Sequence, residues 1–93
     1  MTNTDRMVQL GRKAIEPPGQ AREDLWIINE LGRGMGLDWH YTHPREVFEE
    51  MRKCMDSIAG ITWDRLERDS SVTYPCEKEG DPGEPVVFKT HFP

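Results

Sequence analysis

Proline and glycine divide this 93-residue chain into short segments, and this punctuation strongly limits what it can fold into. Pro17-Pro18-Gly19 stops any regular structure near the N-terminus, and Asp81-Pro82-Gly83 has the composition of a turn. Two helical patterns lie between these proline-containing segments, and Gly36 and Gly60 are placed to end the first and the second pattern. The expected organisation within one domain is an extended lead-in over 1–19, a helical core over 20–70 and an irregular tail over 71–93.

Apolar residues recur at helical spacing in the first part of this core. Leu25, Ile28, Leu31 and Met35 follow one another at steps of three, three and four. This spacing places them on one face of a helix over about 21–35. Acidic residues in its first turn suit the positive end of the helix dipole, which supports the same assignment.

Two more helices are expected after it. The second begins at Pro44, because proline is tolerated at the first helical position, and it runs to about residue 59, before Gly60. A short third helix is expected over 62–69, with Thr62 as its N-cap residue. The charged side chains of this helix alternate in sign, which is typical of a solvent-exposed face. The second helix carries one apolar stripe, made of Val47, Met51, Cys54 or Met55, and Ile58.

Strand-forming residues are few and lie near the two ends. Val8 and Leu10 are two positions apart, which suits a short edge strand. Val72, Tyr74 and residues 86–88 have strand-like side chains and predict at most a loose hairpin, because prolines interrupt it. The expected fold class is therefore mainly α, a small bundle of about three helices with an irregular or weakly β C-terminal tail.

The charge balance restricts the partners of the chain. Twelve Lys and Arg against seventeen Asp and Glu give a net charge of −5, which disfavours binding to nucleic acid or to an anionic membrane surface. No apolar run approaches the roughly 18–20 residues of a membrane span. The polar N-terminal decapeptide lacks the apolar region of a signal peptide, so a cytoplasmic location is the expectation.

Residues that ligate metals are few and do not follow a known ligand spacing. Cys54 and Cys76 are far apart, and two cysteines alone make neither a four-ligand zinc site nor an iron–sulfur site. His40, His43 and His91 add donors without the spacing of a metal motif. We therefore expect the chain alone to hold no metal, although a small metal or redox protein is a hypothesis that these residues leave open.

Two other clusters have alternative interpretations. The segment Trp39-His40-Tyr41 with His43 is either a catalytic or metal-binding group, or an interhelical linker whose rings cover a small core. Glu49 and Glu50 resemble a carboxylate pair, but adjacent helical positions do not face each other, which favours a solvated face. Phosphate loops and hydrolase or zinc-protease motifs are absent from the sequence, so no active site is visible.

The order of the segments resembles the catalytic (alpha) subunit of formate dehydrogenases, in the molybdopterin oxidoreductase family. The resemblance is collinear over essentially all 93 residues. The pieces that carry it are Asn3, Asp5 and Arg6 with Val8-Gln9, Pro17-Pro18-Gly19, Gly36-Leu37-Asp38-Trp39, Glu46-Val47-Phe48, Gly60-Ile61-Thr62-Trp63 and Tyr74-Pro75-Cys76.

The resemblance implies that this chain is an internal segment of a much longer parent that oxidises formate to CO2. The parent would bind molybdenum or tungsten through two pterin guanine dinucleotides, with a cysteine or selenocysteine ligand, and would carry an iron–sulfur cluster. All of these ligands would lie outside the matched segment, so the chain would be structural and inactive alone. Asn3 and Arg6 would lie near the cofactor cleft of the parent, and the remaining domains of the parent would be the partners.

A stand-alone acidic helical module that binds another protein through an exposed surface of Met51, Met55, Trp39 and Trp63 is the alternative function.

If the chain is instead a segment of a longer parent, it should leave apolar surface uncovered when it is isolated. Three short helices cannot bury every large apolar side chain of the sequence, so some of these side chains should face neighbours. The expected uncovered surface joins Trp39 and Tyr41 to Phe88 and Phe92, and it predicts marginal stability or self-association of the isolated chain.

Overall fold

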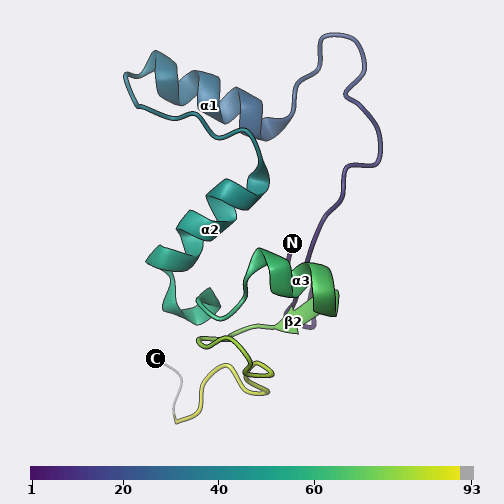
Figure 1. Cartoon of the computed structure of the whole chain (residues 1–93), viewed down its shortest axis with the longest axis vertical. Coiled ribbons are helices and arrows are strands. Elements are labelled where there is room, and N and C mark those ends of the chain that lie inside the picture. Colours follow the sequence, from purple (N-terminus) through teal and green to yellow (C-terminus); the bar gives the residue numbers. More distant parts are fainter. Residues whose placement is uncertain (91–93) are drawn as a thin grey trace. The chain divides into compact units, whose positions relative to one another are not determined.

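The computed structural model describes residues 1–90, in which short helices and strands alternate with long loops (Figure 1). In chain order the elements are β1 (Met7–Gln9), α1 (Asp24–Gly34), α2 (Pro44–Cys54), the 3-10 turn η1 (Asp56–Ile58), α3 (Trp63–Asp69) and β2 (Ser71–Thr73). The mainly α fold class with three helices and a weakly β tail is confirmed. Within the described part of the chain, no helix has both the length and the apolar character needed to cross a membrane.

The chain forms two compact units. Unit 1 combines Met1–Gly11 with Glu49–Pro93, and unit 2 is Arg12–Phe48. The boundary between them falls inside α2.

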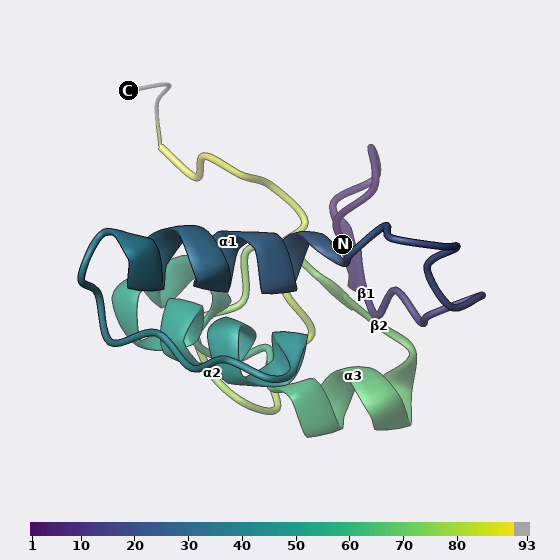
Figure 2. The same ribbon diagram turned by 90° about the horizontal axis from the view of Figure 1, so that it is seen from above.

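A two-stranded antiparallel sheet joins the two ends of the sequence in unit 1. β1 and β2 lie side by side in Figure 2, and Val8 is opposite Val72. The short strand predicted near Val8 is confirmed, whereas the predicted hairpin between Val72 and residues 86–88 is wrong. Val72 pairs with Val8 because both side chains are buried in this pairing, while the side chains of 86–88 stay exposed.

The core of the described chain lies in unit 1. Its buried apolar residues are Val8, Ile58, Ile61, Leu66, Val72 and Cys76. They come from both strands, η1, α3 and the loops beside them, so segments from the start and the end of the sequence build one core.

The third helix has the predicted N-cap. Thr62 has extended backbone angles, and its Oγ1 accepts a hydrogen bond from the Arg65 N–H at 2.9 Å. This bond satisfies one of the N–H groups that have no partner at a helix start. The helix begins at Trp63, one residue later than the predicted 62–69, and ends at Asp69 as predicted.

The second helix begins at Pro44 as predicted but ends at Cys54, so its predicted extension to residue 59 is wrong. Met55 is extended and η1 follows it. The tail uses the backbone groups that a longer helix would need: the Cys76 N–H donates to the Ser57 carbonyl at 2.8 Å, and the Gly60 N–H donates to the Cys76 carbonyl at 2.9 Å. The tertiary pairing therefore replaces the last helical turn.

In unit 2, α1 begins at Asp24, three residues later than predicted, and ends at Gly34, one residue before the predicted end. Glu23 precedes it without a side-chain cap. At the other end Gly36 adopts φ +88°, its N–H donates to the Arg33 carbonyl at 3.0 Å, and the Leu37 N–H donates to the Gly32 carbonyl at 3.0 Å. These two bonds form a Schellman motif, which needs the left-handed conformation that glycine adopts readily.

The buried side of α1 is not its apolar side. Asn29 and Gly32 are buried and Leu25 is half-buried beside them, whereas Ile28, Leu31 and Met35, the rest of the predicted apolar face, are exposed. The loop after α1 returns along the Gly32 side, where a Cβ on Gly32 would lie 2.2 Å from a ring carbon of Trp39. Because Gly32 has no side chain, the loop can pack closely against this face of α1, and the exposed apolar residues lie on another face.

Candidate functional site

Arg6 connects the start of the sequence to the tail of unit 1. Its Nη1 donates to the carbonyls of Tyr74 at 2.6 Å and Glu84 at 3.0 Å, and its Nη2 donates to the Pro85 carbonyl at 2.8 Å. Its own carbonyl accepts from the Tyr74 N–H at 2.8 Å. Arg6 adopts φ +63°, a conformation that is uncommon for residues other than glycine and that these four bonds hold in place.

Asn3 closes the turn in which Arg6 lies. Its Oδ1 accepts from the Met7 N–H at 2.9 Å, and its carbonyl accepts from the Arg6 N–H at 3.0 Å. The structure thus brings together the two residues that the family resemblance associates with a cofactor cleft. Three of the five guanidinium N–H groups of Arg6 are used on carbonyls, and the remaining two, on Nε and Nη2, make no hydrogen bond to the described residues.

These donors do not fit a molybdenum or tungsten centre. An amide and a guanidinium supply no thiolate or imidazole ligand. Among residues 1–90, no three His, Cys, Asp or Glu side chains gather where they could hold a metal ion. Any metal ligand set would have to include residues beyond those described.

The possible metal ligands of the sequence are dispersed or engaged elsewhere. Nε2 of His40 lies 2.8 Å from Asp38 Oδ1, and Nδ1 of His43 accepts from the Arg45 N–H at 3.1 Å at the start of α2. Cys54 is exposed and Cys76 is buried, both as free thiols. His91 lies outside the described residues.

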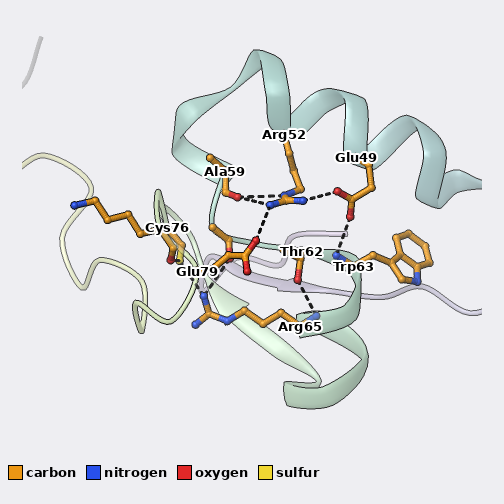
Figure 3. A network of polar contacts seen from close by, with 10 residues as sticks. Glu49, Arg52, Ala59, Thr62, Trp63, Arg65, Cys76 and Glu79 are labelled. Atoms are coloured by element: carbon orange, nitrogen blue, oxygen red, sulfur yellow. Dashed lines mark hydrogen bonds and ion pairs between the residues drawn. The ribbon is translucent and has the colours of Figure 1, made fainter.

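A buried arginine, Arg65, organises the polar interior of unit 1, contrary to the exposed position predicted for it (Figure 3). Arg65 belongs to the charged run that predicts an exposed face, yet it is among the buried polar residues. Its Nη1 donates to the Gly60 carbonyl at 3.2 Å and to Cys76 Sγ at 3.3 Å, and its Nη2 donates to the Asp81 carbonyl. Nothing in its spacing signals burial, because the Cys76 and Asp81 groups that it contacts lie 11 and 16 residues away in the sequence.

The Nε group of Arg65 is paired with the Asp69 carboxylate. Nε of Arg65 lies 3.4 Å from Asp69 Oδ2. The Arg68 guanidinium, followed by that of Arg65, holds the pKa of Asp69 below its ordinary value. The charge of Arg65 is therefore compensated although most of its side chain is out of water.

A second arginine joins α2, η1 and α3 in the same unit (Figure 3). Nε and Nη2 of Arg52 donate to the Ala59 carbonyl at 3.2 and 2.6 Å, and Nη1 pairs with Glu49. Glu49 Oε1 also accepts from the Trp63 N–H at 3.2 Å. The solvated face predicted for Glu49 is thus wrong: its carboxylate connects α2 to the first N–H group of α3, a donor that has no partner inside that helix.

In unit 2, the aromatic segment holds the loop after α1 against that helix. The rings of Trp39 and Tyr41 are 6.5 Å apart at their centroids, and the Asn29 side-chain amide donates to the Tyr41 carbonyl. Beside them lies a pocket of about 350 Å³ that includes Trp26 and His40. Asn29 Oδ1 is buried without a hydrogen-bond partner among the described residues. These contacts support the linker interpretation of the segment, because they hold its backbone and rings against α1.

The expected uncovered surface is divided between the units. Trp39 and Tyr41 are half-buried in unit 2, Phe88 is exposed in unit 1, and Phe92 lies outside the described residues.

Comparison with known proteins shows relatives that are much longer than this chain. A formate dehydrogenase alpha subunit of Methanocaldococcus jannaschii, named as F420-dependent, is 41% identical over 93 residues. A Staphylococcus aureus (strain USA300) protein, provisionally named a formate dehydrogenase, is 34% identical over 91 residues, as is its counterpart in strain N315. No family model matches the chain.

These alignments cover nearly all of the chain and little of the relatives. They include 98% of this chain but only 14% of the M. jannaschii protein and 9% of the S. aureus proteins. The resemblance to a short segment of formate dehydrogenase alpha subunits is therefore confirmed.

Proposed function

We propose that this chain is a structural segment of a formate dehydrogenase alpha subunit and is inactive alone. The observation that carries the proposal is the alignment of 98% of the chain, at 34% and 41% identity, with a small part of proteins named for this activity. The arginine networks of unit 1 support a structural role, because their guanidinium groups are hydrogen-bonded to backbone carbonyls of the chain itself.

The catalytic chemistry belongs to the remainder of the longer polypeptide in this proposal. Oxidation of formate to CO2 releases two electrons and a proton, which require a redox cofactor to accept them. A molybdenum or tungsten bis-pterin guanine dinucleotide and an iron–sulfur cluster would supply that chemistry, held by residues outside this segment. The described residues do not fit the ligand set of such a centre, so no catalytic step is assigned to them.

Asn3 and Arg6 take a positioning role in this proposal. Their hydrogen bonds fix the turn before β1 against the tail, so they would shape a wall near the cofactor cleft of the subunit. The partners would be the other parts of that subunit, and the location would be cytoplasmic.

The test is to express the complete polypeptide that contains these residues, with the 93-residue chain as a control. We expect formate-dependent reduction of a viologen dye and bound molybdenum or tungsten only in the complete polypeptide. Arg6→Ala should lower its metal content and activity, whereas Arg12→Ala, a matched change at an exposed arginine, should leave both unchanged. A complete polypeptide that does not oxidise formate when fully loaded with metal would refute the proposal.

A stand-alone interaction module is the second candidate, and one observation favours it: the apolar face of α1 is exposed. An open reading frame that encodes these residues without flanking sequence similar to the relatives would establish this alternative.

A further inference from the structure

One helix of unit 2 exposes a continuous apolar stripe. Ile27, Ile28, Leu31 and Met35 have exposed fractions of 48, 53, 65 and 74%. At 3.6 residues per turn their positions fall within an arc of about 100° around α1 and its C-cap. They therefore form one surface, which we call the α1 stripe.

The neighbouring side of the same helix is already occupied. Asn29 donates to the Tyr41 carbonyl, and Gly32 lies against the Trp39 ring. Glu30 and Arg33, between the two sides, pair with each other. The loop therefore packs on the side that carries Asn29, Gly32 and the half-buried Leu25, while the four apolar residues of the stripe remain exposed.

We infer that the α1 stripe is the docking face for another segment of the same, longer polypeptide, outside these 93 residues. This inference rests on the proposed function, because it requires that longer polypeptide. The relatives place 86–91% of their length outside the aligned segment, which provides ample chain to cover the stripe (the covered shares are 14% and 9%).

The size of the stripe favours a covalently connected occupant over a second copy. Its four residues expose on the order of 450 Å², within the range of the largest apolar patches on ordinary monomers. A stable complex of separate proteins buries about 800 Å² on each partner. A smaller surface suffices for a segment of the same chain, because its packing does not cost the translational and rotational freedom of a separate molecule.

Met35 provides the test, since it belongs to the stripe and its thioether is oxidised to a sulfoxide when peroxide reaches it. The oxidation rate of Met35 is measured by mass spectrometry in the 93-residue chain and in the complete polypeptide. We expect a rate within about twofold of free methionine in the short chain at every protein concentration. In the complete polypeptide we expect at least a tenfold slower rate.

Two variants of the complete polypeptide refine the test. Leu31→Asp introduces a charge into the stripe and should restore fast oxidation of Met35. Glu30→Gln, one residue away and outside the stripe, should leave Met35 protected. If Leu31→Asp does not accumulate, the comparison of the two unmodified proteins decides the matter.

Three results would overturn the inference. Fast oxidation of Met35 in the complete polypeptide would show that the stripe stays uncovered. Protection in the short chain that grows with concentration would assign the stripe to a second copy. Protection in the short chain at all concentrations would assign it to residues of the chain itself.

Formate oxidation is measured separately on the same complete polypeptide. Protected Met35 without formate oxidation would refute the proposed function and retain the docking face. Formate oxidation with unprotected Met35 would refute the docking face and retain the function.

Discussion

Unit 1 and unit 2 are stabilised in different ways. All six buried apolar side chains of the described residues lie in unit 1, where they come from both strands, η1, α3 and adjacent loops. The buried residues of unit 2 are Asn29 and Gly32. Unit 2 contains a helix with a Schellman motif at its C-terminal end but no side-chain N-cap, and it lacks an apolar core of its own. Local backbone signals can thus specify a helix whose apolar residues remain exposed.

The largest expected difference is between two isoleucines, one in each unit. Ile61 is fully buried, so Ile61→Ala should lower the free energy of unfolding of unit 1 by about 3 kcal/mol, from lost transfer energy and a cavity. Ile28 lies on the exposed stripe, so Ile28→Ala in the 93-residue chain should change stability by less than about 0.5 kcal/mol. Denaturant unfolding followed by circular dichroism, with amide hydrogen exchange for each unit, measures both. Equal losses at both sites would show that the two units share a core.

Two glycines should respond to alanine with opposite signs. A Cβ on Gly60 would lie 2.3 Å from the Lys78 carbonyl oxygen, so Gly60→Ala should destabilise unit 1 by about 2 kcal/mol. A Cβ on Gly34, in the last turn of α1, would meet nothing within 4 Å. Gly34→Ala should stabilise α1 by about 0.5–1 kcal/mol, because alanine is the better helix former. Thermal melts of both variants give the signs, and a destabilising Gly34→Ala would contradict the open space around that residue.

The N-cap of α3 should contribute a smaller amount. Thr62→Ala removes the acceptor of the Arg65 N–H and should cost about 1 kcal/mol. Thr62→Ser keeps a hydroxyl at the same place and serves as the matched control. Similar losses in both variants would mean that the methyl group of Thr62, and not its hydroxyl, stabilises this helix start.

The smallest expected effect concerns the start of α2 in unit 2. The Thr42 N–H donates to Glu46 Oε2 at 2.8 Å, and this bond chiefly lowers the pKa of the Glu46 carboxyl from its ordinary value of 4.5. A lowered folded-state pKa stabilises the helix start at pH values above the ordinary one, and this stabilisation is lost as the pH falls through the lowered value.

NMR titration of the Thr42 amide proton should show that transition. Its midpoint should lie below 4.5, and Glu46→Gln should abolish it. A midpoint at or above the ordinary value would indicate that the hydrogen bond does not form in solution.

Local signals predicted the ends of several elements correctly. Pro44 begins α2, Thr62 caps α3 and Gly36 terminates α1. Each of these depends on a residue type whose backbone or side chain suits one position at a helix end. The candidate site was harder to predict from the sequence. Asn3 and Arg6 were singled out by family resemblance alone. Their structural roles became visible only in the hydrogen bonds of Asn3 within the turn and of Arg6 to the distant tail.

The predictions that are wrong concern backbone and side-chain groups that form hydrogen bonds with distant segments of the sequence. The expected last turn of α2 gives way to hydrogen bonds with Cys76, and Val72 pairs with Val8 instead of the tail. Arg65 is drawn inside by the carbonyls of Gly60 and Asp81, although its neighbours in sequence are charged. Propensity is a weak guide where such tertiary contacts exist.

The sequence by itself determined the helices, their caps and the relatives of this chain, because these depend on residue type, spacing and order. Only the tertiary structure decided which face of α1 is buried and which strands pair. Periodicity shows that a helix has an apolar face, but the loop that packs on Gly32 and Asn29 leaves that face exposed. Burial depends on what the rest of the polypeptide brings against a surface, and a pattern along one segment does not contain that information.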